Sequence, residues 1–205
     1  MNAGSQCEGF KVQAVYSRSM EKAKEYAEKY GIEDCYDSLD ALAAAKDIDA
    51  VYVASPNALH AGQSIKMLKA GKHVLCEKTI ASNSGELEQM FKAAEENQVM
   101  VIEAMRSVFD PGFAAIQKNL PKLGKIRRAT FQYCQYDNFK KGIIENAFKP
   151  ELSNGSLMDI GVYCVHPMVK LFGLPNEISA HCLKLSNGVD ASGTIVAMYD
   201  EMQAE

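Results

Sequence analysis

The segment 157–172 carries the most informative group of polar residues in the chain. Its sequence, LMDIGVYCVHPMVKLF, is mostly apolar and predicts a largely buried helix. The polar exceptions recur at i, i+4, i+7 and i+11 and therefore share one helix face; they are Asp159, Tyr163, His166 and Lys170. A carboxylate, a phenol and an imidazole on one face could exchange protons with a substrate. The same stripe fits a partner surface, a wet cavity or plain contact with solvent.

Two further polar groups directly follow predicted strands. Glu77 and Lys78 come at the end of the strand expected over residues 72–77, and the turn 55–57 (Ser-Pro-Asn) follows the apolar run 50–54. Ligands of open α/β sheets bind at the carboxyl ends of strands, so both positions are candidates for a site. The alternatives are an exposed lysine at a strand end and a turn that caps the next helix.

The first half of the chain alternates short β-branched runs with helical patterns, which must position these groups. Strands are expected at residues 11–16, 50–54, 72–77 and 99–103, and helices at 19–30, 38–45 and 58–70 and after a cap at Asn83 or Ser84. Such alternation predicts an α/β fold with a parallel sheet, helices on both faces and right-handed crossovers.

The alternation of strands and helices changes after the turn signal Asp-Pro-Gly at residues 110–112. A short helix is expected at 113–120, and alternation over 126–136 predicts a half-buried antiparallel strand. Two more strands are expected near 177–185 and 193–200. We therefore expect two domains: residues 1–108 with the parallel sheet, and residues 109–205 as an α+β domain with an open, mainly antiparallel sheet.

Composition narrows the function classes. The 205 residues include 22 Lys and Arg and 26 Asp and Glu, for a net charge of −4, which argues against a nucleic-acid-binding protein. No apolar run approaches the roughly 18 residues of a membrane helix, and the first residues do not form a signal peptide. The six cysteines form no C-x-x-C pair, which favours reduced thiols in a cytoplasmic protein. We expect no metal site.

Four collinear segments together resemble the glucose–fructose oxidoreductase/inositol dehydrogenase (Gfo/Idh/MocA) family. They are AVYSRS (14–19), DIDAVYVASPNALH (47–60), AGKHVLCEKT (70–79) and NGSLMDIGVYCVHPMVKLFG (154–173). The resemblance covers most of the chain. It implies a Rossmann domain that binds NAD(P), followed by a domain whose sheet supports the substrate site. Members transfer hydride between NAD(P) and a carbinol of a sugar, polyol, dihydrodiol or related alcohol.

The resemblance implies catalytic roles for Lys78, Asp159 and Tyr163. In the family the lysine lies near the nicotinamide and the substrate hydroxyl, where a cation polarises a carbonyl. Tyr163 stands where many members have an acid/base histidine, although the glucose–fructose oxidoreductase and dimeric dihydrodiol dehydrogenase branches have tyrosine. A free phenol titrates at about pH 10, so a neighbouring ammonium has to favour the phenolate.

The same three residues and His166 are expected to bind the substrate, namely Lys78, Asp159, Tyr163 and His166. Asp159 would orient substrate hydroxyls or Lys78. His166 would be a second polar contact, and a structural histidine is the equal alternative.

The resemblance also implies the cofactor contacts, which would be Ser17, Arg18, Ser55, Pro56, Asn57, His60, Glu77, Lys78 and Arg106. NAD-specific Rossmann proteins carry an acid after the second strand, and an arginine suits the 2′-phosphate of NADP. Because this chain has Ser17 and Arg18 there, we expect NADP, with NAD as the alternative. The family usually has proline after the lysine, whereas this chain has Thr79.

The Rossmann phosphate-binding motif G-x-G-x-x-G does not occur in the sequence. Residues 1–11 resemble the tail of a first helix, and residues 199–205 stop inside or just after a strand. We expect an internal fragment that lacks the first strand and the glycine-rich turn. Such a fragment would bind dinucleotide weakly or not at all, with little activity, and the intact protein would be a homo-oligomer.

Two functions therefore remain open at this point. The first is an NAD(P)-dependent oxidoreductase acting on CH–OH groups, and the second is a non-catalytic sensor or interaction protein with the family fold. Retention of Lys78, Asp159 and Tyr163 favours the enzyme, and the missing glycine-rich turn favours the second function. Substrate choice would depend on residues such as Arg106, Tyr136, Asp137 and Phe139.

Overall fold

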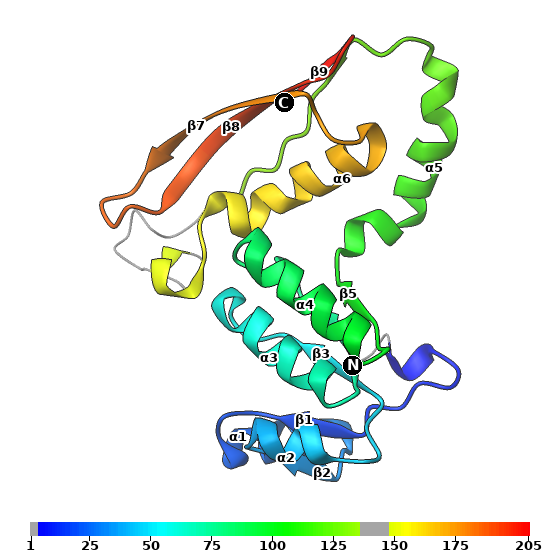
Figure 1. Ribbon diagram of the computed structural model, residues 1–205, viewed down its shortest axis with the longest axis vertical. Coiled ribbons are helices and arrows are strands. Elements are labelled where there is room, and N and C mark those ends of the chain that lie inside the picture. Colours follow the sequence, from blue (N-terminus) through cyan, green and yellow to red (C-terminus); the bar gives the residue numbers. More distant parts are fainter. Residues whose placement is uncertain (1–3, 136–147) are drawn as a thin grey trace. The chain divides into compact units, whose positions relative to one another are not determined.

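The computed structural model describes residues 4–135 and 148–205 (Figure 1). Tyr136, Asp137 and Phe139, expected above to influence substrate choice, lie outside the described residues. The chain divides into two compact units. The first comprises Met1–Val53, Ala61–Cys76 and Asn83–Ile102, and the second comprises Ala54–His60, Glu77–Ser82 and Glu103–Glu205. The turn 55–57 and the segment that carries Lys78 therefore belong to the same unit as the helix that carries Tyr163.

The first unit alternates strands and helices, which confirms the predicted α/β fold. Its elements are β1 (Ala14–Tyr16), α1 (Met20–Tyr30), β2 (Asp34–Tyr36), α2 (Leu39–Ala44), β3 (Ala50–Val53), α3 (Asn57–Lys69), β4 (His73–Cys76), α4 (Ser84–Glu96) and β5 (Val101–Glu103). Helix signals in the sequence act locally as predicted. Ser38 and Asn83 accept hydrogen bonds from the first turns of α2 and α4, and Gly31 ends α1 in the left-handed conformation, with φ 66°.

The strands of the first unit form two sheets. β1 pairs parallel with β2, and β3 pairs parallel with β4 in a second sheet of order β3-β4-β5. Within the described chain no strand joins β1 to β3. The core of this part of the unit includes buried side chains from β4 and from the helices α3 and α4; they are Val74, Cys76, Met67, Leu68 and Met90.

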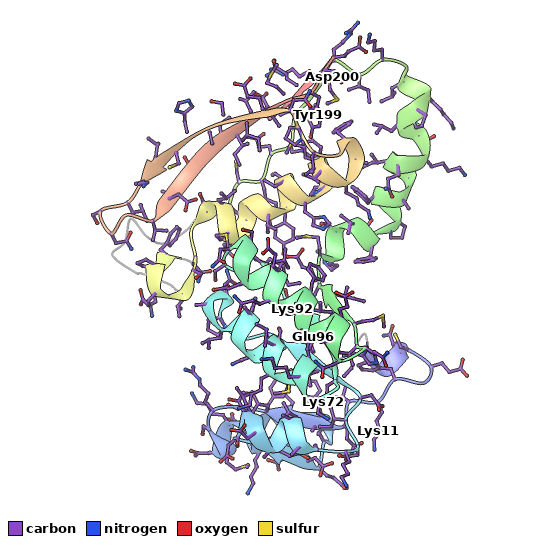
Figure 2. The ribbon with its side chains drawn as sticks, viewed as in Figure 1. Lys11, Lys72, Lys92, Glu96, Tyr199 and Asp200 are labelled. Atoms are coloured by element: carbon purple, nitrogen blue, oxygen red, sulfur yellow. The ribbon has the colours of Figure 1, made fainter. Side chains whose placement is uncertain are left out.

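Lys72, labelled in Figure 2, is a buried lysine just before β4. It is only 4% exposed, and its Nζ donates to Ala45 O at 2.5 Å and to Ile48 O at 2.9 Å. These two carbonyls lie in the loop after α2, where no helical N–H follows to bind them. Lys72 therefore fastens the α2–β3 loop to the start of β4.

Replacing Lys72 with methionine is expected to destabilise the first unit. Methionine keeps the apolar stem and leaves both carbonyls without a donor, which costs about 1–3 kcal/mol. Urea unfolding followed by circular dichroism would show a lower midpoint with an unchanged slope. An unchanged midpoint would mean that water replaces the ammonium without penalty.

The second unit packs a helix against an open sheet. Its elements are η2 (Arg106–Phe109), α5 (Pro111–Asn119), η3 (Leu120–Leu123), β6 (Arg128–Ala129), η6 (Pro150–Leu152), the π-turn η7 (Leu157–Gly161), α6 (Val162–Phe172), β7 (Glu177–Lys184), β8 (Asp190–Met198) and β9 (Gln203–Ala204). The sheet has the order β6-β9-β8-β7, and α6 covers it through Met168 and Phe172, which pack against Ala197, Phe131 and Tyr199 (Figure 1).

The predicted antiparallel strand over 126–136 was wrong in extent and direction. Among the described residues of that stretch only Arg128 and Ala129 form a strand, and they pair parallel with β9. The flanking backbone continues toward the same partner, because Phe131 N donates to Glu205 O at 2.7 Å. The antiparallel part of the sheet is β7-β8-β9, so the sheet is mixed.

None of the helices in the described part of the chain has both the length and the apolar character needed to cross a lipid bilayer.

Candidate active site

Lys78 follows β4, and Asp159 holds its ammonium group. Nζ donates to Asp159 Oδ1 at 2.8 Å and to the backbone oxygen of Asp159 at 2.6 Å. The Lys78 side chain is 18% exposed and that of Asp159 is 39% exposed, so the pair lies at the edge of the interior. An ammonium group has three N–H donors. Asp159 occupies two of them, which leaves one for a substrate oxygen.

Tyr163 lies one helical turn after Asp159, and its ring is held from two directions. Lys78 Nζ lies 5.2 Å from the ring centroid, and the ring of Tyr133 stacks on it at 5.3 Å between centroids and 21° between planes. The described part of the chain gives the phenol oxygen no hydrogen-bond partner. A fixed ring with an available hydroxyl, beside an ammonium, is suited to exchanging a proton with a bound alcohol.

The helix that carries these residues begins with a π-turn, whereas the sequence predicted one regular helix over 157–172. Val162 N–H bonds to Leu157 O, five residues back, in place of Met158 O. Met158 O instead accepts from Thr79 Oγ1 at 2.6 Å, while Asp159 O accepts from Lys78. The wider turn thus frees backbone oxygens that hold the Lys78–Thr79 segment, whose connecting peptide bond is cis.

Asp190, in β8, fixes the start of this helix. Its Oδ2 accepts from Ser156 Oγ at 2.6 Å and from Leu157 N at 2.7 Å. Gly155 precedes these residues with φ 154°, and a Cβ built there would collide with Asp190 Oδ1. Glycine is therefore required where the chain enters the helix.

The turn 55–57 and His60 connect to the same segment. Asn57 Nδ2 donates to Asn154 Oδ1 at 2.7 Å, just before the π-turn. His60 is 1% exposed, and its Nδ1 and Nε2 lie 2.8 Å from Thr79 O and 2.7 Å from Ser55 O. Its ring thus bridges the loops after β3 and β4. Ser55 Oγ is buried and has no hydrogen-bond partner within the described residues.

Glu103 is a site residue that sequence reasoning missed. Its Oε1 accepts from Ile80 N at 3.0 Å, and its Oε2 lies 3.9 Å from His166 Nε2. The other ring nitrogen of His166 is buried, without a partner in the described chain. The available signal was position, because Glu103 ends β5 just as Cys76 ends β4, next to Glu77 and Lys78. Carboxyl ends of neighbouring strands meet at one edge of a sheet.

Two of the predicted cofactor residues belong to the first unit, whereas Lys78, Asp159 and Tyr163 belong to the second. Ser17 and Arg18 follow β1 in the first unit, where Ser17 N donates to Tyr36 O at 3.1 Å. The guanidinium groups of Arg18 and Arg106 are exposed, and neither has a partner among residues 4–135 and 148–205. Their proposed contacts with a cofactor stay predictions.

Neighbouring groups offer no alternative chemistry. Burial and the nearby Cys134 raise the pKa of the Cys164 thiol above its ordinary value, so this thiol is a poor nucleophile at neutral pH. Within the described residues, no three His, Cys, Asp or Glu side chains gather in a way that could hold a metal ion. The groups that the structure brings together at this site are Lys78, Asp159 and Tyr163, and their catalytic roles stay predictions.

Comparison with known families agrees with this geometry. The sequence model of the oxidoreductase family GFO_IDH_MocA, with an NAD-binding Rossmann fold, matches residues 1–105. The chain belongs to the Gfo/Idh/MocA family. A second model, of the GFO/IDH/MocA C-terminal domain, matches residues 120–204. The family resemblance and the fold class expected from the sequence are thereby confirmed.

Individual relatives are similar across nearly the whole chain. Scyllo-inositol 2-dehydrogenase (NADP(+)) IolU of Bacillus subtilis is 49% identical, over 100% of this chain and 63% of its own length. Trans-1,2-dihydrobenzene-1,2-diol dehydrogenase of Xenopus laevis is 34% identical, over 92% of this chain and 57% of its own length. The chain is also similar to the solved structure of KijD10, a 3-ketoreductase from Actinomadura kijaniata in complex with NADP and TDP-benzene. The TM-score is 0.86 at 27% identity, and the match covers 99% of this chain and 63% of the KijD10 chain. The chain thus spans less than two thirds of each relative.

Proposed function

We propose that the protein carrying this chain is an NADP-dependent oxidoreductase that transfers hydride between the nicotinamide and a CH–OH group of a polyol or sugar. The observation that supports it best is the ammonium of Lys78, held by Asp159 with one free donor, beside the free phenol of Tyr163. Alcohol oxidation needs a proton acceptor and a cation at the same oxygen atom, and this cluster contains both.

The residues divide the reaction as follows. When bound, the nicotinamide would supply the hydride acceptor for oxidation of the carbinol carbon and the hydride donor for the reverse reduction. Tyr163 in its phenolate form, beside the Lys78 ammonium, takes the hydroxyl proton during oxidation, and the resulting phenol gives the proton back during reduction. The free N–H of Lys78 stabilises the negative charge that develops on the substrate oxygen, and Asp159 keeps that N–H aimed.

NADP is the cofactor that we propose from the polar groups of this chain. Arg18, directly after β1, has an uncommitted guanidinium for the 2′-phosphate, and Ser55 Oγ is a buried hydroxyl without a partner among the described residues. The residues that would hold the cofactor are Ser17, Arg18, Ser55, Pro56, Asn57, Glu77, Lys78 and Arg106. The names of IolU and of the KijD10 complex support NADP.

Replacing Arg18 with alanine is expected to weaken NADPH binding roughly 10- to 100-fold, as for loss of a hydrogen bond to a charged group. Binding of NADH, which lacks the 2′-phosphate, should change little. Fluorescence titration with each dinucleotide measures both constants, and the absence of tryptophan keeps the protein background low. Equal weakening for the two dinucleotides would exclude a role in 2′-phosphate recognition.

A cyclic polyol is the substrate class we propose, because the relative with 49% identity is an inositol dehydrogenase. We further propose a cytoplasmic location, since the six cysteines form no C-x-x-C pair and no pattern of a secreted disulfide framework. The open sheet is our proposed surface for homo-oligomers, since every residue of β7 is exposed, with Ile178 at 63% and Leu183 at 72%.

The function is tested with the purified 205-residue chain. We expect weak but saturable binding of NADPH, because the sequence contains no G-x-G-x-x-G turn. We also expect NADPH to form from NADP when scyllo-inositol is added, measured as a single turnover at high protein concentration. A folded chain that binds NADPH and transfers no hydride to or from any inositol would contradict the proposal and favour the non-catalytic alternative.

A further inference from the structure

The segment that carries Lys78 is held in place by several elements of the second unit. Thr79 is bound through its hydroxyl to Met158 O and through its carbonyl oxygen to His60 Nδ1. Ile80, two residues after Lys78, donates its backbone N–H to Glu103 Oε1 at 3.0 Å. The backbone next to Lys78 is therefore held by groups other than Asp159, which binds the ammonium itself.

Glu103 differs from the other contacts because it reaches two parts of the site at once. One carboxylate oxygen binds the Ile80 amide, and the other lies 3.9 Å from His166 Nε2. His166 is three residues after Tyr163 in α6. The Glu103 side chain is 17% exposed, so its interactions are only partly weakened by water.

We propose that Glu103 is a positioning residue for the Lys78–Tyr163 pair. Its carboxylate sets the separation between the loop after β4, which carries Lys78, and the helix α6, which carries Tyr163. The interaction with Ile80 N is the stronger of the two, because its 3.0 Å separation is a hydrogen-bond distance and the 3.9 Å separation from His166 Nε2 is not. The proposal rests on the proposed function only for its effect on turnover.

Two substitutions separate the parts of this role. Glu103→Gln keeps a side-chain oxygen for the Ile80 amide and loses the charge that attracts His166. Glu103→Ala loses both. Asp110→Ala is the matched control, because the Asp110 carboxylate also accepts a backbone N–H, from Gly112 at 2.7 Å, but touches none of residues 77–80.

The first readout does not depend on activity. Exchange of the Ile80 amide hydrogen, followed by NMR, should be at least about tenfold faster in Glu103→Ala and nearly unchanged in Glu103→Gln and Asp110→Ala. Acylation of the Lys78 amine, followed by mass spectrometry, should also be several-fold faster in Glu103→Ala. Unchanged exchange and unchanged acylation in Glu103→Ala would overturn the proposal, even if that variant lost stability.

The second readout compares the change in the single-turnover rate of hydride transfer with the change in the Kd for NADPH. Glu103→Ala should lower the rate of hydride transfer at least about tenfold while the Kd for NADPH stays within a factor of two, and Glu103→Gln should recover most of the rate. Wild-type rates in Glu103→Ala would overturn the positioning role. If the wild type transfers no hydride while exchange and acylation change as expected, the positioning role stands and the proposed function fails.

Discussion

Lys78→Met is expected to lower the rate of hydride transfer by about 10²- to 10³-fold, the loss found when a donor to a developing negative charge is removed. Methionine keeps most of the volume of the side chain but has no N–H for the substrate oxygen. Binding of NADPH should weaken much less than the rate falls. The measurement is single-turnover formation of NADPH from a polyol, together with a fluorescence titration of the cofactor.

Lys72→Met is the control for this substitution, because the two lysines have similar local bonding. Each donates its ammonium to two oxygens, Lys72 to two backbone carbonyls and Lys78 to Asp159. Lys72→Met should lower stability and leave the rate of the folded protein unchanged. Lys78→Met should fold normally and lose the rate. If both variants lose rate in proportion to their loss of folded protein, Lys78 has no chemical role.

Tyr163→Phe is expected to lower the rate by about 10²- to 10⁴-fold, the usual contribution of a positioned acid–base group. Phenylalanine keeps the ring that stacks on Tyr133 and lies beside Lys78, so the helix should not move. Only the oxygen that exchanges the proton is removed. The apparent affinity for the polyol should change by less than about tenfold, since most of its hydroxyls keep their contacts.

Tyr133→Phe tests whether the oxygen or the ring matters. The Tyr133 ring stacks on the ring of Tyr163. The substitution Tyr133→Phe removes the phenol oxygen of Tyr133 and keeps the stacked pair of rings. This variant should keep the wild-type rate within a factor of a few. A loss as large as that of Tyr163→Phe would show that the acid–base role is wrongly assigned between the two tyrosines.

The helices of the first unit were predictable because their signals are local, whereas the strand β2 (Asp34–Tyr36) was not expected. The caps Ser38 and Asn83 and the terminating Gly31 act within one turn of their helices, so none of the three depends on distant partners. The strand at 126–136 was not predictable in the same way. Apolar and polar residues do alternate in this stretch, but the partner strand β9 lies about 75 residues later in the chain. That pairing decides whether the strand runs parallel or antiparallel.

The site was predictable as a set of residues and not as a geometry. Family motifs indicated Lys78, Asp159 and Tyr163, and the structure brings these three together. The π-turn was invisible, because the oxygen of Met158 is claimed by Thr79, about 80 residues earlier in the chain. Glu103 escaped for the same reason, since its role depends on contacts with Ile80 and His166 that no local pattern encodes.

The most direct test of the central claim is transfer of deuterium from a carbinol-deuterated inositol to NADP in a single turnover, read from the mass of the NADPH formed. The account predicts labelled NADPH with the wild-type chain and a rate at least about 10²-fold lower with Lys78→Met and with Tyr163→Phe, although all three chains bind NADPH. Label transfer at the wild-type rate by both variants would contradict it, as would unlabelled cofactor from a wild-type chain that binds both ligands.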